Sequence, residues 1–141
     1  MAHPDLDDLL SELLPFAQDM LAKHGEFFPY GSAMTKSGEI VAHAAHDGAE
    51  QPPSQQLIDM LTAGFRKKAA AGEIRAAGIC YDARIVPPDQ EEKTDAICVS
   101  LEHESGEATE VYMPYKKGWL GRIKYGDIFA EPREPQFFPK K

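Results

Sequence analysis

Two stretches of the chain, Ile74–Val86 and Thr94–His103, alternate large and small side chains with a period of two residues. Side chains of a β-strand point alternately to its two faces, so Ile79 falls on one face of the first stretch and Cys80 on the other. Both faces of these stretches are apolar, which is typical of central strands covered on both sides. The chain is therefore expected to fold around a sheet with these two strands at its centre.

The remaining sequence predicts two helices and three further strands. Apolar residues at spacings of three and four indicate one helix over residues 5–24 and a second that runs from Ser54 to a stop at Gly72. Alternating segments predict strands over Phe27–Thr35, Glu39–His46 and Thr109–Tyr115. Trp119–Phe129 is less regular, and its pattern leaves open whether it adds a short strand.

Together these segments predict a single α+β domain over residues 1–130, in the order α-β-β-α-β-β-β. The sheet is expected to be antiparallel with about five strands, and both helices are expected to pack on one of its faces. Residues 131–141 contain three prolines, which predict an extended C-terminal tail that lies on the surface or frays. A chain of 141 residues is long enough for one such domain without a disulfide or a metal.

Both helices carry recognisable end signals. Asp5 and its acidic neighbours suit the positive end of a helix dipole, and Gly25 follows the first helix as a stop. Pro15 removes one backbone hydrogen bond, which predicts a bend at that point. Ser54 is the expected N-cap of the second helix.

Turn chemistry fixes the pairing of neighbouring strands in two hairpins. A three-residue turn centred on Ser37 places Met34 opposite Ile40. Between the last two predicted strands, a three-residue loop pairs Val99 with Val111, whereas a two-residue loop would place a charge in this apolar row. The apolar pairs favour the three-residue loop.

The two cysteines lie on the small-residue faces of the central strands. A loop centred near Asp89 would put Cys80 opposite Cys98, and Ile79 would then join the row of Val99. A buried thiol acts as a small apolar side chain with little reactivity. Both cysteines are therefore expected to be reduced, buried and structural.

The charge balance limits the classes of partner. Fifteen basic and 23 acidic residues give a formal net charge of −8, which makes nucleic acid and anionic membranes unfavourable partners. No apolar run is long enough to span a membrane, and the acidic N-terminus does not resemble a signal peptide. Two cysteines are too few for a secreted disulfide scaffold, so a cytoplasmic location is expected, and no cofactor is predicted.

The element order resembles that of roadblock/profilin-like domains, although the Pro-rich tail replaces the final helix that is usual in roadblock domains. Three short segments are also similar to segments of uncharacterised bacterial proteins: Glu26–Gly31, Met113–Lys116 and Tyr125–Ala130. They cover under a fifth of the chain, and no activity follows from either resemblance.

His43, His46 and Asp47 are the best candidates for metal ligands in the sequence, and they carry the alternative of a small metal-assisted hydrolase. Within one strand the two histidines point to opposite faces, so both could reach one ion only if the strand ends near Ala44. A third ligand would come from elsewhere, with His103 the one remaining histidine in the middle of the chain. The competing interpretation is a polar end of an edge strand.

Charge and aromatic residues gather near the C-terminal part of the domain. No acidic residue occurs between Val111 and Gly126, and this stretch contains four tyrosine or tryptophan and four basic side chains. They are Tyr112, Tyr115, Lys116, Lys117, Trp119, Arg122, Lys124 and Tyr125. Such residue types anchor interfaces, so they form the predicted binding surface, although lysines on an edge strand would also explain them.

Acidic residues form a second predicted surface, a rim carried by two loops. It comprises Asp89, Glu91, Glu92, Asp95, Glu102, Glu104 and Glu107. The leading hypothesis is a non-catalytic module that acts through protein–protein contact and forms a homodimer. A narrower form is an acidic inhibitor or immunity-type protein, for which the net charge would speed association with a basic target. A third hypothesis is a small-ligand sensor, with a cavity lined by Phe28, Tyr30 and Tyr81.

Overall fold

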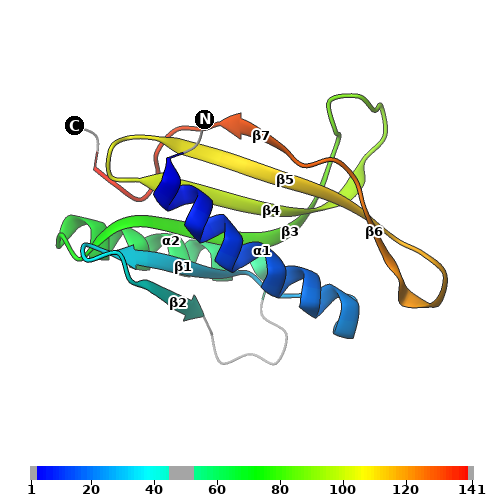
Figure 1. The fold of residues 1–141 in the computed structure, drawn as a ribbon, viewed down its shortest axis with the longest axis horizontal. Coiled ribbons are helices and arrows are strands. Elements are labelled where there is room, and N and C mark those ends of the chain that lie inside the picture. The colour runs from blue at the N-terminus through cyan, green and yellow to red at the C-terminus, as the bar shows by residue number, and fades with distance from the viewer. Residues whose placement is uncertain (1–2, 45–52, 140–141) are drawn as a thin grey trace.

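The computed structural model describes residues 3–44 and 53–139, which form a sheet between two helices (Figure 1). The elements are α1 (Pro4–His24), β1 (Tyr30–Thr35), β2 (Ile40–Ala44), α2 (Ser54–Ala70), β3 (Ile74–Ile85), β4 (Thr94–His103), β5 (Ala108–Lys117), β6 (Ile123–Tyr125) and β7 (Phe129–Pro132), with a short 3-10 turn at Trp119–Gly121 between β5 and β6. The strand order is β2-β1-β3-β4-β5-β6, and β7 also pairs with β5. All pairings are antiparallel, which confirms the predicted α+β class.

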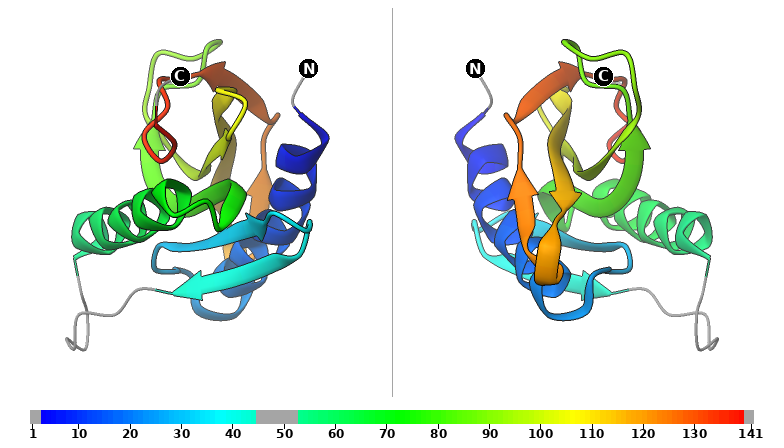
Figure 2. Two further views of the ribbon diagram at one scale, coloured as in Figure 1. Left: turned by 90° about the vertical axis from the view of Figure 1, so that its left-hand side faces the viewer. Right: turned by 90° about the vertical axis from the view of Figure 1, so that its right-hand side faces the viewer.

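The two helices cover opposite faces of the sheet, so the expectation that they share one face is wrong (Figure 2). Helix α1 packs Leu6 and Leu13 against a face that includes Cys80 and Val99. Helix α2 packs Leu61 and Phe65, with other residues, against the face that carries Ile79. Because both faces of the central strands are apolar, each needs its own cover.

The pairing of β3 with β4 differs by one residue from the prediction. Cys80 lies opposite Val99, and Tyr81 lies opposite Cys98. A slip of one residue moves every side chain to the other face, so the two thiols point to opposite sides and Ile79 does not share a face with Val99. With this register each face combines large side chains from one strand with small ones from the other, which gives both helices a surface to pack on.

The other two predicted hairpins are confirmed. Met34 pairs with Ile40, and Val99 pairs with Val111. Gly38 and Gly106 both adopt positive φ, at 95° and 102°, as the bulged loops require. The row on the face of α1 therefore runs through Cys80, Val99 and Val111.

The helices begin and end near the predicted residues. Helix α1 continues through Pro15 to the left-handed cap at Gly25, as expected for the stop. Helix α2 has Pro53 as its N-cap without a capping side chain, and Ser54 is its first residue, so the predicted N-cap is wrong by one position. No helix among residues 3–44 and 53–139 combines the length and apolarity needed to cross a bilayer.

Gly78 allows α1 to approach the centre of the sheet. A Cβ atom at this position would lie 2.7 Å from Leu13 Cδ1 and 2.8 Å from Leu101 Cδ2. Both leucines are 1% exposed and cannot move away at low cost. The helix and strand therefore pack closely here because Gly78 has no side chain.

The C-terminal segment is part of the packed domain rather than a fraying surface tail. Phe137 and Phe138 are buried with Phe65 on the face of α2. The backbone N–H groups of Gln136, Phe137 and Phe138 donate to the carboxylate of Glu102, which is fully buried. The domain therefore extends beyond residue 130.

Candidate functional site

The hairpin formed by β5 and β6 presents two large apolar side chains to solvent. Trp119 is 84% exposed and Leu120 81% exposed, whereas the next most exposed large apolar residue among the described ones, Phe16, is 51% exposed. Leu120 also adopts left-handed backbone angles, φ 58° and ψ 31°, which a leucine rarely tolerates. Exposed apolar residues on a strained turn are typical of a contact surface.

Four basic side chains surround this tip, namely Lys116, Lys117, Arg122 and Lys124, and all are exposed. Lys116 and Lys124 lie directly opposite each other in the β5–β6 pairing, an arrangement in which like charges repel. None of the four forms an ion pair with another residue of the described chain. The tip is therefore an apolar pair beside four basic side chains that form no ion pair in the described chain.

A shallow hollow of about 220 Å³ lies beside the hairpin. Lys116 and Lys124 line it together with Gln90, Thr94 and Tyr125. The ammonium groups and the amide can donate hydrogen bonds to an acidic group of a partner. The hollow therefore offers hydrogen-bond donors beside the apolar tip.

The predicted tyrosines are not all on this surface. Tyr115 is 2% exposed and donates its hydroxyl to the Asp82 carboxylate at 2.9 Å. Burial raises the pKa of Tyr115, and the adjacent Asp82 raises it further. Tyr112 is half-buried and stacks on Phe129, with ring centroids 4.9 Å apart. The exposed surface is thus smaller than predicted and consists of the hairpin, which includes the half-buried Tyr125.

The predicted acidic rim is not one surface. Asp89, Glu91 and Glu92 are exposed before β4, whereas Glu104 follows β4 at its opposite end and pairs with Lys36. Glu102 is fully buried and does not belong to any rim. The remaining two members, Asp95 and Glu107, contact Arg84 and the backbone N–H of His3, respectively.

The structure describes one of the three predicted metal ligands, His43. His46 and Asp47 lie outside the described residues. The His43 ring packs edge-on against Phe65 on the face of α2, with ring centroids 5.2 Å apart. His103 lies on the other face, where it contacts Asp5 near the start of α1. His43 and His103 therefore cannot share an ion.

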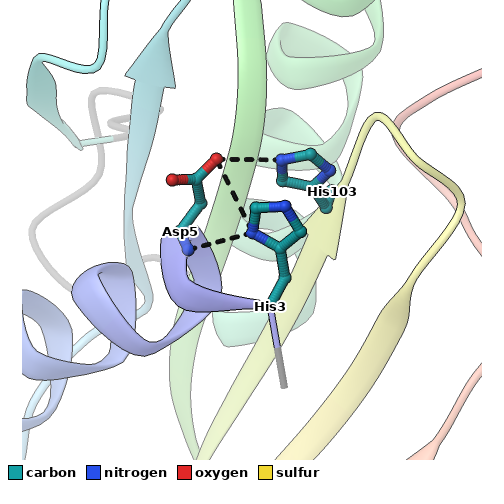
Figure 3. A group of neighbouring side chains, drawn as sticks. All are labelled: His3, Asp5 and His103. Carbon is teal, nitrogen blue, oxygen red and sulfur yellow. Dashed lines mark hydrogen bonds and ion pairs between the residues drawn. The ribbon is translucent and has the colours of Figure 1, made fainter. Parts of the chain in front are cut away.

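A different cluster, His3, Asp5 and His103, places three metal-ligating side chains together (Figure 3). Asp5 Oδ2 lies 2.9 Å from His103 Nε2 and 3.7 Å from His3 Nδ1, and the two imidazole rings stack at 3.8 Å. The Arg75 guanidinium also contacts Asp5, with Nε 3.1 Å from Oδ2. Nothing in the sequence connects residues 98 positions apart, so this cluster was not predictable.

The donor atoms of this cluster are already occupied by hydrogen bonds. His103 Nδ1 accepts the Ser105 N–H, so the ring proton sits on Nε2 and is donated to Asp5. His3 Nδ1 accepts the Asp5 N–H at 3.0 Å. A metal needs free lone pairs on these nitrogens, and Arg75 already neutralises the carboxylate. The arrangement is a junction that joins α1, β3 and β4 through hydrogen bonds and an ion pair.

This junction predicts a pH-dependent contribution to stability. Burial raises the pKa of Asp5, but hydrogen bonds from His103 and Arg75 outweigh it and lower the pKa below its ordinary value. Asp5→Asn should therefore lower the free energy of unfolding at neutral pH by about 1–3 kcal/mol. A carboxyl group whose pKa is lower in the folded than in the unfolded protein stabilises the folded state at pH values above its unfolded pKa. This stabilisation is lost as the pH falls through the folded pKa. In urea unfolding, the free energies of unfolding of the wild type and of Asp5→Asn should therefore converge at acidic pH. Asp8→Asn, at an exposed position, should change the free energy of unfolding little at any pH.

The sheet also separates the two cysteines from each other, and it separates two of the residues that were expected to line a ligand cavity. Cys80 and Cys98 are free and buried, as predicted, and burial raises the pKa of each thiol to about 12. Tyr30 contacts α1 through its hydroxyl, which donates to the Leu13 carbonyl, whereas Tyr81 lies on the face of α2. The two tyrosines therefore do not line one cavity.

No family model, curated protein or solved structure matches the chain. The hairpin is the candidate site on its geometry alone.

Proposed function

We propose that this chain is a non-catalytic module that binds a partner protein through the β5–β6 hairpin. The observation that carries the proposal is the exposure of Trp119 and Leu120 among four exposed basic side chains. Tryptophan supplies a large contact area and is enriched among residues that dominate binding energy. The expected partner surface has an apolar depression bordered by carboxylates.

The backbone at the tip supports the same proposal. Holding Leu120 in a left-handed conformation costs of order 1–3 kcal/mol, and glycine is the ordinary residue for such a position. A contact made by the leucine side chain would offset this cost in the complex. The location proposed for the module is the cytoplasm, supported by two buried free cysteines.

The exposed acidic loop favours a narrower second candidate, the inhibitor or immunity-type protein. Asp89, Glu91 and Glu92 project from the loop between β3 and β4. Together with the net charge of −8, they would accelerate encounter with a basic toxin or nuclease. In this form of the proposal the acidic loop, rather than the hairpin, makes the first contact.

Site-specific photo-crosslinking tests the role of the hairpin. A photoreactive phenylalanine analogue replaces Trp119 in cells that naturally produce the chain, and a matched protein carries it at Met60, which is exposed on α2. We expect a protein captured at position 119 and not at position 60. Lys116→Glu with Lys124→Glu should strongly reduce capture, because like charges across an interface cost several kcal/mol. Equal capture at both positions, or none, contradicts the proposal.

A further inference from the structure

A groove of about 430 Å³ lies between the first half of α1 and the strands β5 and β7. Leu10, Leu101, Val111 and Ala130 are among its apolar lining residues. Two acidic residues border it, Asp7 and Glu107. Its volume lies within the range of about 300–1,000 Å³ that is typical of pockets that enclose a ligand group.

The groove and the hairpin tip are complementary in chemistry. The tip carries Trp119 and Leu120 with basic neighbours, and the groove offers apolar walls with acidic neighbours. Neither Asp7 nor Glu107 forms an ion pair with a residue in the described ranges. An apolar anchor with opposite charges around it is the usual composition of a specific interface.

We propose that the partner of the hairpin is a second copy of this chain, whose groove receives Trp119 and Leu120. This inference rests on the proposed function, since it names the partner of the same hairpin. It also gives the homodimer expected from the sequence a defined contact.

A chain cannot insert the tip into its own groove. The groove lies at the Ala108 end of β5. The β5–β6 hairpin lies at the other end of this strand (Figure 1). Lys117 lies nine residue steps along the strand from Ala108, which corresponds to about 30 Å at ~3.3 Å per residue. Two chains with antiparallel β5 strands place each tip near the groove of the other, so one two-fold axis generates both contacts.

The self-association state of the full chain tests this inference. Sedimentation velocity should show a dimer whose dissociation constant rises at least about tenfold in a Trp119→Ala, Leu120→Ala double variant. Ala130→Arg, which places a cation in the groove, should have the same effect. Ala130→Ser and Met60→Ala serve as controls and should leave the dimer unchanged. Circular dichroism checks folding, and Asp7→Lys, at an exposed position that lines the groove, replaces Ala130→Arg if the latter does not fold.

Mixing the two kinds of variant tests the pairing of tip with groove. A tip variant retains an intact groove, and a groove variant retains an intact tip, so the mixture can form one native contact although neither variant can form any alone. We expect heterodimers at concentrations where each variant alone is monomeric. A tip-to-tip contact would give no such rescue, and that result overturns the proposal.

The inference and the proposed function fail in different ways. A monomer at high concentration, combined with capture of another protein at position 119, overturns the inference and leaves the proposed function standing. Crosslinks from position 119 to the α1–β7 region of a second copy support both. Dimerisation that is unaffected by either class of variant overturns the inference as well.

Discussion

Replacing Glu102 with alanine should lower the free energy of unfolding by about 3–5 kcal/mol, the usual cost of removing one partner from a buried charged pair. The carboxylate is fully buried and accepts three backbone hydrogen bonds, from Gln136 at 2.6 Å, Phe137 at 2.8 Å and Phe138 at 2.7 Å. The Arg133 guanidinium lies 3.7 Å away. The variant leaves these donors without their acceptor, which is costlier than the loss of the bonds alone. Urea unfolding measures the effect.

Two further variants show whether the destabilisation by Glu102→Ala depends on the C-terminal segment. Glu92→Ala, at an exposed loop position, should change the free energy of unfolding by less than about 0.5 kcal/mol. In a chain truncated after Pro135, Glu102 faces solvent, so Glu102→Ala should there cost little. The difference between the two backgrounds is the coupling energy. An equal cost in both would show that Glu102 acts independently of the segment.

The parts of the fold that sequence could predict are those set by local chemistry. Strand alternation and positive-φ glycines determine the β1–β2 and β4–β5 hairpins, because a three-residue turn leaves one register. The β3–β4 connection spans residues 86–93 and does not impose a register by its length. A loop centre misplaced by half a residue therefore moved Cys98 to the wrong face.

The same distinction applies to the candidate site. The basic and aromatic residues of the hairpin are contiguous in sequence, so composition alone identified the stretch. Which of them face solvent depends on tertiary packing, which buries Tyr115 against the strand that carries Asp82. The burial of Glu102 likewise depends on a segment more than 30 positions away in sequence. A carboxylate in a strand ordinarily indicates an exposed position. Glu102 is an exception because the C-terminal segment packs over it.

Phe65→Ala should also destabilise the protein by about 3–5 kcal/mol, because it removes one of the three buried phenylalanines from the core on the face of α2. Phe65 is 1% exposed, and its ring lies edge-on to Phe137, with centroids 5.5 Å apart. A Cβ atom at Gly31 would lie only 2.9 Å from the ring, so the strand beneath is already as close as it can be. The neighbours therefore cannot collapse into the space that the variant leaves. Met60→Ala, on the exposed side of the same helix, should cost less than about 1 kcal/mol.

Hydrogen exchange should show where Phe65→Ala acts. The Phe137 side chain packs directly on Phe65, and the backbone N–H group of Phe137 donates to the Glu102 carboxylate. Losing the ring should let the C-terminal segment open locally, so the Phe137 and Phe138 amides should lose more protection than the amide of Val99 on β4. Val99 faces α1, whose packing the substitution does not touch. A uniform loss at all three amides would instead mean that the two faces of the sheet unfold as one unit.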